Sequence, residues 1–261
     1  MIDWNAVWKR ITHDLSEAFF PTRCVICNEF YTPPRECPRV EDIRKIQFAE
    51  IMAPCLCSEC IGTSDFSFVE SPVYGNKLNP PRQFRTARAV AAYNQEDEVF
   101  AKMIRKFKYD DEIQLAHPFE MLIFSSFVRH WEQSEIDLVM PVPLHARRLR
   151  KRRFNQSYLL IRKWPGLGKA FDIDLSHLRI EWDALVRIRD TFPQVNLKGK
   201  ERKENIREAF SIKRPSAVRG KKVLLVDDIY TTGATANECA KELLKSGAEY
   251  TDVLTLGRTV F

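Results

Sequence analysis

Two adjacent carboxylates and a short hydroxyl-rich run form the clearest chemical signal in this sequence. The apolar stretch Val223 to Val226 predicts a buried strand that delivers Asp227 and Asp228 to its carboxyl end, where ligands bind in open α/β sheets. Backbone N–H groups at the start of a helix and threonine hydroxyls suit a phosphate monoester, and glycine permits its close approach. Such a loop comes next here and enters a predicted helix: Thr231, Thr232, Gly233, Ala234 and Thr235.

The two acids would repel that phosphate, so we expect them to accept hydrogen bonds from neighbouring ribose hydroxyls. A phosphate at one end and a diol at the other describe a ribose 5-phosphate. On its own, a strand followed by two aspartates is a weak signal, because paired acids also bind magnesium in many folds. A structural alternative is that the three threonines act only as caps of the helix.

A dense basic cluster lies in the middle of the chain. Guanidinium groups are bidentate donors to phosphate oxygens, so the cluster favours polyphosphate or nucleic acid as its partner. A solvated basic loop is the alternative. The cluster consists of Arg147, Arg148, Arg150, Lys151, Arg152 and Arg153.

Six of the seven cysteines lie between positions 24 and 60. Two C-x-x-C pairs supply four thiolates, which is how a closed tetrahedral zinc site is held. Cys37 or Cys55 could replace a member of the second pair. Reduced cysteines without a metal, or a redox pair, are alternatives, but neither pair opens a helix after a strand as in thioredoxin-like folds. The pairs are Cys24 with Cys27 and Cys57 with Cys60.

The elements that must position these groups can be predicted from hydrophobic periodicity. We expect an N-terminal amphipathic helix within residues 1–20, and a zinc ribbon at 21–62 that needs a metal because it holds few apolar residues. Residues 63–261 predict a parallel α/β domain, with 165–210 as a peripheral hood. Strands are expected at 86–93, 136–142, 223–226 and 250–256. Helices are expected at 98–131, with a break near Asp110, at 155–164 and at 237–246. Gly247 is expected to cap the last helix at its C-terminus.

Composition adds only general limits. Hydrophobic residues make up 44% of the 261 residues and charged residues 29%, which suits a substantial core and argues against wholesale disorder. No apolar stretch approaches the roughly 18 residues of a membrane span, and acids stand where a secretory signal would have an apolar core. We therefore expect a cytoplasmic protein without a membrane span.

The run from Val223 to Thr235 resembles the phosphoribosyl pyrophosphate (PRPP) motif of type I phosphoribosyltransferases. Three further stretches, with the cysteine pairs, make the chain similar to the ComF family over about residues 19 to 258. These stretches are Pro141-Val142-Pro143-Leu144-His145 leading through Arg148 and Arg152 to Phe154-Asn155-Gln156; Lys108-Tyr109 before Leu115-Ala116; and Gln194, Arg202, Asn205, Ala209 and Phe210 in that order.

The resemblance implies an N-terminal zinc ribbon with structural Zn²⁺ and a type I phosphoribosyltransferase fold. It implies PRPP or another ribose 5-phosphate compound as ligand, with Mg²⁺ beside PRPP, and a role in natural competence, the uptake of DNA for transformation. A competence helicase is an implied partner. The family's pyrophosphate loop corresponds to residues 144–153 together with the adjoining Phe-Asn-Gln stretch, and the residues carried over are Arg147, Arg148, Arg152, Asn155 and Gln156.

Two positions depart from the resemblance. The family usually has glycine before Phe-Asn-Gln, where this chain has Arg153; if φ is positive there, arginine costs about 1 kcal/mol or more. Some phosphoribosyltransferases place an acid three residues after the carboxylate pair to handle a proton of the incoming base. That position is Thr231 here, so the motif contains no evident general base.

Two functions fit these observations. In an active phosphoribosyltransferase of nucleotide or related metabolism, Asp227 and Asp228 would be catalytic residues that hold the ribose while magnesium and arginine stabilise the departing pyrophosphate. In a binding protein of DNA uptake, the basic cluster would follow the phosphates of single-stranded DNA while Phe154 or Tyr158 stacks on bases. We favour the competence-linked role with a PRPP-type pocket.

Overall fold

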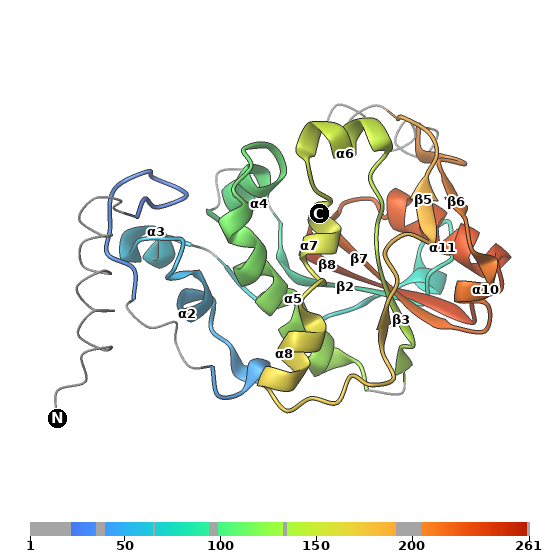
Figure 1. Cartoon of the computed structure of the whole chain (residues 1–261), viewed down its shortest axis with the longest axis horizontal. Helices are drawn as coiled ribbons and strands as arrows, with labels where there is room; N and C mark the ends of the chain where they lie inside the picture. The colour runs from blue at the N-terminus through green and yellow to red at the C-terminus, as the bar shows by residue number, and fades with distance from the viewer. Residues whose placement is uncertain are drawn as a thin grey trace, which may run out of the picture.

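The centre of the fold is a six-stranded sheet of strand order β1-β2-β8-β7-β3-β4 (Figure 1). The computed structural model describes residues 22–34, 40–64, 66–93, 99–132, 135–191 and 205–259. Only β1 is antiparallel to its neighbour, and the other four pairings are parallel. The predicted α/β class with a parallel sheet is confirmed. The strands are β1 (Val73–Tyr74), β2 (Thr86–Ala92), β3 (Leu138–Pro141), β4 (Arg179–Ile180), β7 (Lys222–Tyr230) and β8 (Tyr250–Arg258).

Alternate residues of β7 face two different cores. Val223 and Leu225 pack with α11 (Ala234–Lys245), whereas Leu224 and Val226 pack on the other face with α4 (Val99–Tyr109) and α5 (Ala116–His130). All four side chains are fully buried. A strand that is apolar on both faces must be covered on both, so the sheet lies between two helical layers.

The cysteine-rich segment shares one of these cores. It contains η1 (Ile43–Lys45), α2 (Phe48–Met52) and α3 (Ser58–Gly62). Ile43, Met52 and Leu56 are buried in the same cluster as the side chains of α5. Figure 1 shows this segment, in blue, beside the helices of the sheet domain. The shortage of apolar residues in its sequence is therefore offset by packing against a helix of the larger domain.

Several predicted elements are confirmed with shifted ends. β2, β3 and β8 fall on the predicted strands, and the predicted break near Asp110 separates α4 from α5, with η3 (Ile113–Leu115) between them. Gly247 follows α11 with φ of 92°, as its predicted capping role requires. Within the described part of the chain, no helix has both the length and the apolar character to cross a membrane.

One difference concerns the basic cluster. The stretch 144–153, predicted as a loop, folds as α6 (Ala146–Arg152), because alanine, leucine, lysine and arginine are good helix formers and His145 Nδ1 accepts from the N–H of Arg147 over 3.4 Å. Arg153 ends this helix with φ of 62°, so the cost foreseen for a side chain at this position does arise.

The helix predicted at 155–164 is divided into α7 (Gln156–Leu159) and α8 (Trp164–Ala170). Pro165 is the reason, because proline suits the first turn of a new helix and not the interior of an existing one.

The strand predicted at 223–226 continues to Tyr230. Its parallel partner β8 also extends further than predicted and pairs Asp227 with Thr255 and Tyr230 with Arg258. The helix that comes next begins at Ala234, three residues earlier than expected. Both acids therefore belong to the strand itself, and the turn after them is shorter than predicted.

The predicted hood, residues 165–210, is only partly peripheral. Its strand β4 is an edge of the main sheet, paired with β3. β5 (Leu185–Arg187) and β6 (Phe210–Ile212) form a separate antiparallel pair that packs with α11. The N-terminal helix at 1–20, Cys37, Gln194 and Arg202 lie outside the described residues.

A buried carboxylate ties three elements together at the amino end of the sheet. Asp252 on β8 accepts from Arg85 at both oxygens, over 3.1 Å and 2.6 Å. The backbone N–H of Thr86 donates to it over 3.1 Å, and the indole N–H of Trp131, just after α5, over 2.9 Å. The guanidinium of Arg85 also lies 4.0 Å from the ring centre of Tyr250.

We expect Asp252→Asn to lower the free energy of unfolding by about 3 kcal/mol, because Arg85 would lose a buried anionic partner and the amide cannot accept every donor. Glu135→Gln is the control. Glu135 also faces Arg85, at 3.5 Å, but its side chain is 37% exposed, so a change below about 0.5 kcal/mol is expected. Urea denaturation measures both, and equal losses would contradict a special role for Asp252.

Candidate functional site

The four cysteines predicted to bind metal lie together. Cys24 and Cys27 lie on a tight turn, Cys57 precedes α3, and Cys60 lies within that helix. Their sulfur atoms are all within 4.8 Å of one another, and those of Cys27 and Cys57 are 3.8 Å apart. Four thiolates about 2.3 Å from a tetrahedral zinc ion would be about 3.8 Å from each other. The cluster is thus suited to a metal ion, and zinc is the ion that this ligand set favours.

Backbone groups favour a thiolate at Cys24, whereas the pKa values of Cys27 and Cys60 are raised in the cluster of four thiols. Burial alone would raise the pKa of the Cys24 thiol, but backbone N–H groups of Cys57, Cys27 and Ile26 together lower it to about 7. Such donors stabilise the charged sulfur that a metal requires.

The alternative ligand Cys55 lies outside this cluster. Its thiol is buried and donates to the backbone carbonyl of Gln114 over 3.6 Å. Cys57 and Cys60 therefore form the second pair. Cys37, the other alternative, lies outside the described residues.

The acid pair lies on the central strand β7 and is compensated by two neighbouring segments. Lys108 Nζ, at the end of α4, is 2.7 Å from Asp228 Oδ1, and these side chains are only 15% and 14% exposed. Ser157 Oγ and the N–H of Asp228 both donate to Asp227 Oδ1, over 3.0 Å and 2.9 Å. Burial, followed by the charge of Asp228, raises the pKa of Asp227 to about 7. The acid pair thus faces one ammonium group, and Asp227 holds its proton more tightly than usual.

The predicted phosphate loop is a turn that enters α11, as the hypothesis requires. Thr231 and Thr232 are half-buried, and α11 begins immediately after Gly233. Gly233 has φ of 70°, and a Cβ there would lie 2.4 Å from the Tyr230 hydroxyl, so only glycine fits. As N-cap it offers no side chain to the first N–H groups of the helix. Thr232 Oγ1 is buried and has no hydrogen-bond partner in the described structure.

The arginines of α6 differ in their surroundings. Arg147 is exposed and pairs with Asp190 over 3.3 Å. Arg148 is half-buried and donates to the backbone carbonyl of Thr191. Arg152 lies 4.9 Å from the ring centre of Tyr109 and donates to Gln156 Oε1 over 3.2 Å.

Asn155 and Gln156 bind protein backbone. Asn155 caps α7 by accepting from the N–H of Ser157 over 3.1 Å, and its amide donates to the carbonyl of Val142. The amide of Gln156 lies 3.4 Å from the carbonyl oxygens of Phe107 and Lys108. In this structure both amides position the two residues that contact the acids, Ser157 and Lys108.

Sequence reasoning missed two groups near the acids and one arginine of the hood. Lys108 was noted only as part of a family stretch, and Ser157 was not singled out. Arg187 on β5 is half-buried; burial, then the nearby charge of Arg148, lowers its pKa to about 10, while the charge of Asp227 acts in the opposite direction. No sequence pattern marks Arg187, because the charges that most shift its pKa come from distant segments, although its guanidinium donates to the nearby Thr191 hydroxyl.

The chain is similar to proteins of DNA utilization and competence. It shares 29% identity over 213 residues with the DNA utilization protein YhgH of Escherichia coli strain K12, which covers 78% of this chain and 85% of that protein. With Competence protein F of Haemophilus influenzae it shares 30% identity over 166 residues, 62% of this chain and 69% of that protein. With Competence protein ComFC of Bacillus subtilis strain 168 it shares 25% over 175 residues, 67% and 65% of the two chains.

No family model matches the chain. Among solved structures, an allosteric regulatory enzyme of purine biosynthesis shares 20% sequence identity over 50% of this chain and 23% of that chain, with a TM-score of 0.29. That TM-score is too low to support an argument about fold, which rests on the strand order and pairing described above.

We expect the purified protein to hold one zinc ion per chain, Cys57→Ser to hold almost none, and Cys55→Ser to keep its zinc. Loss of one thiolate opens the tetrahedral site, whereas the thiol of Cys55 lies outside the cluster and donates to a backbone carbonyl. Elemental analysis with thermal melting provides the test. Zinc retained by Cys57→Ser, or lost from Cys55→Ser, would contradict the assignment.

We expect Asp227→Asn to raise the melting temperature at pH 8 by about 2–4 °C and to change it little near pH 5. The folded-state pKa of Asp227 lies above its unfolded value, so ionisation of this group opposes folding increasingly as pH rises from about 4 through 7. Asparagine removes that charge and keeps an oxygen for both donors.

Asp228→Asn is the matched control, and we expect it to lower the melting temperature at pH 8, because Lys108 would lose its partner. Calorimetry at the two pH values measures both variants. Destabilisation by Asp227→Asn at pH 8 would show that burial of this charge is not costly.

Proposed function

Because the chain belongs to the ComF family of competence and DNA-utilization proteins, we propose that it binds a ribose 5-phosphate compound such as PRPP and acts in DNA uptake. One observation carries the ligand assignment. Asp227 and Asp228 lie toward the carboxyl end of a central parallel strand, and a glycine turn then begins α11. Ligands of open α/β sheets bind at this end of the strands.

Each part of the site has a distinct role in the proposed complex. The 5′-phosphate accepts from the first N–H groups of α11 and from the unpaired hydroxyl of Thr232. The ribose hydroxyls donate to the acid pair. Lys108, which compensates Asp228 before the ligand arrives, stays within reach of ligand oxygens. The phosphate loop and the acids thereby fix the two ends of the sugar.

The pyrophosphate would lie toward α6 and the hood. Arg148 lies close enough to Arg187 to lower its pKa, and no carboxylate lies within ion-pair distance of either among the described residues. Two half-buried guanidinium groups that repel each other favour a polyanion between them. Mg²⁺ would add positive charge to PRPP there, and the acid pair offers oxygen ligands of the kind it prefers.

We favour binding over turnover. Phosphoribosyl transfer would require a group that takes a proton from the acceptor base, and Thr231 offers only a hydroxyl at the position where some relatives of this fold carry an acid. If transfer does occur, Asp227 and Asp228 would hold the ribose while positive charge develops at its C1′ carbon.

Contact with single-stranded DNA is proposed for the exposed face of α6. Arg147, Arg150, Lys151 and Arg153 are exposed there and can follow a phosphate backbone. Phe154 is a weaker candidate for stacking on bases, because its ring packs toward Phe107 at 6.3 Å. A competence helicase stays a proposed partner on family grounds.

We expect the zinc-loaded protein to bind PRPP in the presence of magnesium, and Asp228→Asn to weaken that binding at least tenfold, because a charged acceptor for ribose hydroxyls is lost. Asp174→Asn removes an exposed carboxylate elsewhere and serves as control, with a change below twofold expected. Isothermal titration measures both. The proposal fails if neither PRPP nor ribose 5-phosphate binds, or if the two variants bind PRPP equally.

A further inference from the structure

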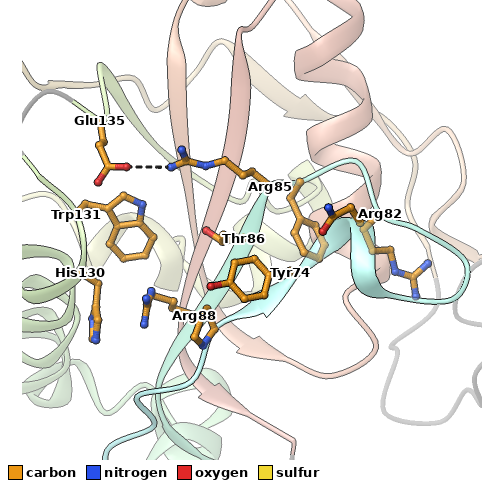
Figure 2. A pocket seen from close by; sticks show the side chains of 11 residues that line it. Tyr74, Arg82, Arg85, Thr86, Arg88, His130, Trp131 and Glu135 are labelled. Atoms are coloured by element: carbon orange, nitrogen blue, oxygen red, sulfur yellow. Dashed lines mark hydrogen bonds and ion pairs between the residues drawn. The ribbon is translucent and has the colours of Figure 1, made fainter.

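A cavity of about 500 Å³ opens at the β1–β2 edge of the sheet, separate from the acid pair (Figure 2). β1, the segment before β2, β2 itself and the end of α5 line it, and none of the predicted site residues does. Asp227 and Asp228 lie on β7, two strands further into the sheet. Its volume falls within the range of about 300–1,000 Å³ typical of small-molecule sites.

The lining is rich in arginine. Arg82, Arg85 and Arg88 line the cavity, with Glu135 as the carboxylate. Figure 2 shows Arg85 directed toward Glu135, and Asp252 also pairs with it, so Arg85 is already compensated. The other two arginines have no carboxylate within ion-pair distance among the described residues, and this leaves cationic charge at the cavity.

Arg88 and Arg82 keep unused donor capacity. Arg88 donates to the backbone carbonyl of Glu70 over 2.8 Å, while the carboxylate of Glu70 binds Arg129 and His130 instead. Burial lowers the pKa of Arg88, which shows a guanidinium partly removed from water without full compensation. Arg82 donates to the carbonyl of Thr232 over 3.2 Å, and its buried Nε has no partner in the described structure. An anion in the cavity would use the remaining donors of Arg88, whereas Figure 2 shows the side chain of Arg82 directed away from Arg88.

Aromatic rings stand beside these cations. Tyr74 is 44% exposed, so one face of its ring is available. The ring of Trp131 is held in place by its hydrogen bond to Asp252, and the guanidinium of Arg88 lies 6.0 Å from its centre. An exposed phenol is a surface on which a planar ring stacks, whereas Trp131 is only 7% exposed and lines the wall of the cavity; Figure 2 shows both rings around Arg88.

We propose that this cavity binds one nucleoside 5′-phosphate, with the base stacked on Tyr74 and the phosphate held by Arg88. The same chemistry is present in a free nucleotide and in one unit of single-stranded DNA. Arg82 joins the wall of the cavity to the loop of Thr232, but the two proposed ligand contacts, Arg88 and Tyr74, lie on β2 and β1 and do not depend on the ribose 5-phosphate site proposed on β7.

The test uses full-length, zinc-loaded protein that carries Asp228→Asn, so that a nucleotide bound at β7 contributes little. Thymidine 5′-monophosphate and a 5′-phosphorylated thymidine octamer are titrated separately by calorimetry. We expect Arg88→Gln and Tyr74→Ala each to raise the Kd at least tenfold, because one removes the phosphate donor and the other the stacking surface. Arg219→Gln, which removes an exposed arginine elsewhere, should change the Kd less than twofold.

The two probes distinguish the sources of the ligand. Equal affinity for both, with full competition, supports a free nucleotide, whereas tighter octamer binding that the monophosphate displaces poorly supports single-stranded DNA. Arg88→Lys, which keeps the charge and loses the planar fork, gives an intermediate Kd in either case. Thermal melting of each variant confirms folding. Absence of binding by both probes at millimolar concentration, or Kd values for folded Arg88→Gln and Tyr74→Ala within twofold of the parent, would overturn the proposal.

Discussion

Burial of two adjacent carboxylates at the end of β7 is the constraint on which the site depends. A central parallel strand is covered on both faces, so charges carried on it lose much of their contact with water. Here the cost is met by one lysine from α4, one hydroxyl from α7 and one backbone N–H, and Asp227 still holds its proton more tightly than usual. The positions of α4 and α7 are therefore linked to the chemistry of the acid pair.

The sequence predicted the parts of this arrangement that reside in contiguous residues. The strand, turn and helix around Asp227 could be read from local pattern, and the two C-x-x-C pairs identify four residues that the fold brings together. Their exact ends could not be predicted, because β7 is as long as its ladder with β8 allows, and that pairing is tertiary.

What sequence pattern could not supply were groups that meet only through the fold. Lys108 and Ser157 reach the acids from segments about 120 and 70 residues away in the sequence, and Arg187 comes from a stretch without clear periodicity. The basic cluster was predicted as a loop because it corresponds to the family's pyrophosphate loop, whereas its residues are also good helix formers. Arg153 shows the opposite case: the glycine expected from the family pointed correctly to a left-handed backbone.

The common core of the cysteine-rich segment and α5 has a practical consequence for dissection of this protein. Ile43, Met52 and Leu56 cover apolar side chains of the sheet domain. In a fragment that starts near residue 63, these side chains would be exposed to water. Such a fragment would tend to aggregate. Its inactivity would therefore not show whether the cysteine-rich segment or the sheet domain carries the activity. Oxidation of the cysteine thiols in this segment would disturb the same shared core. Samples of this protein should therefore be compared only in the same redox state.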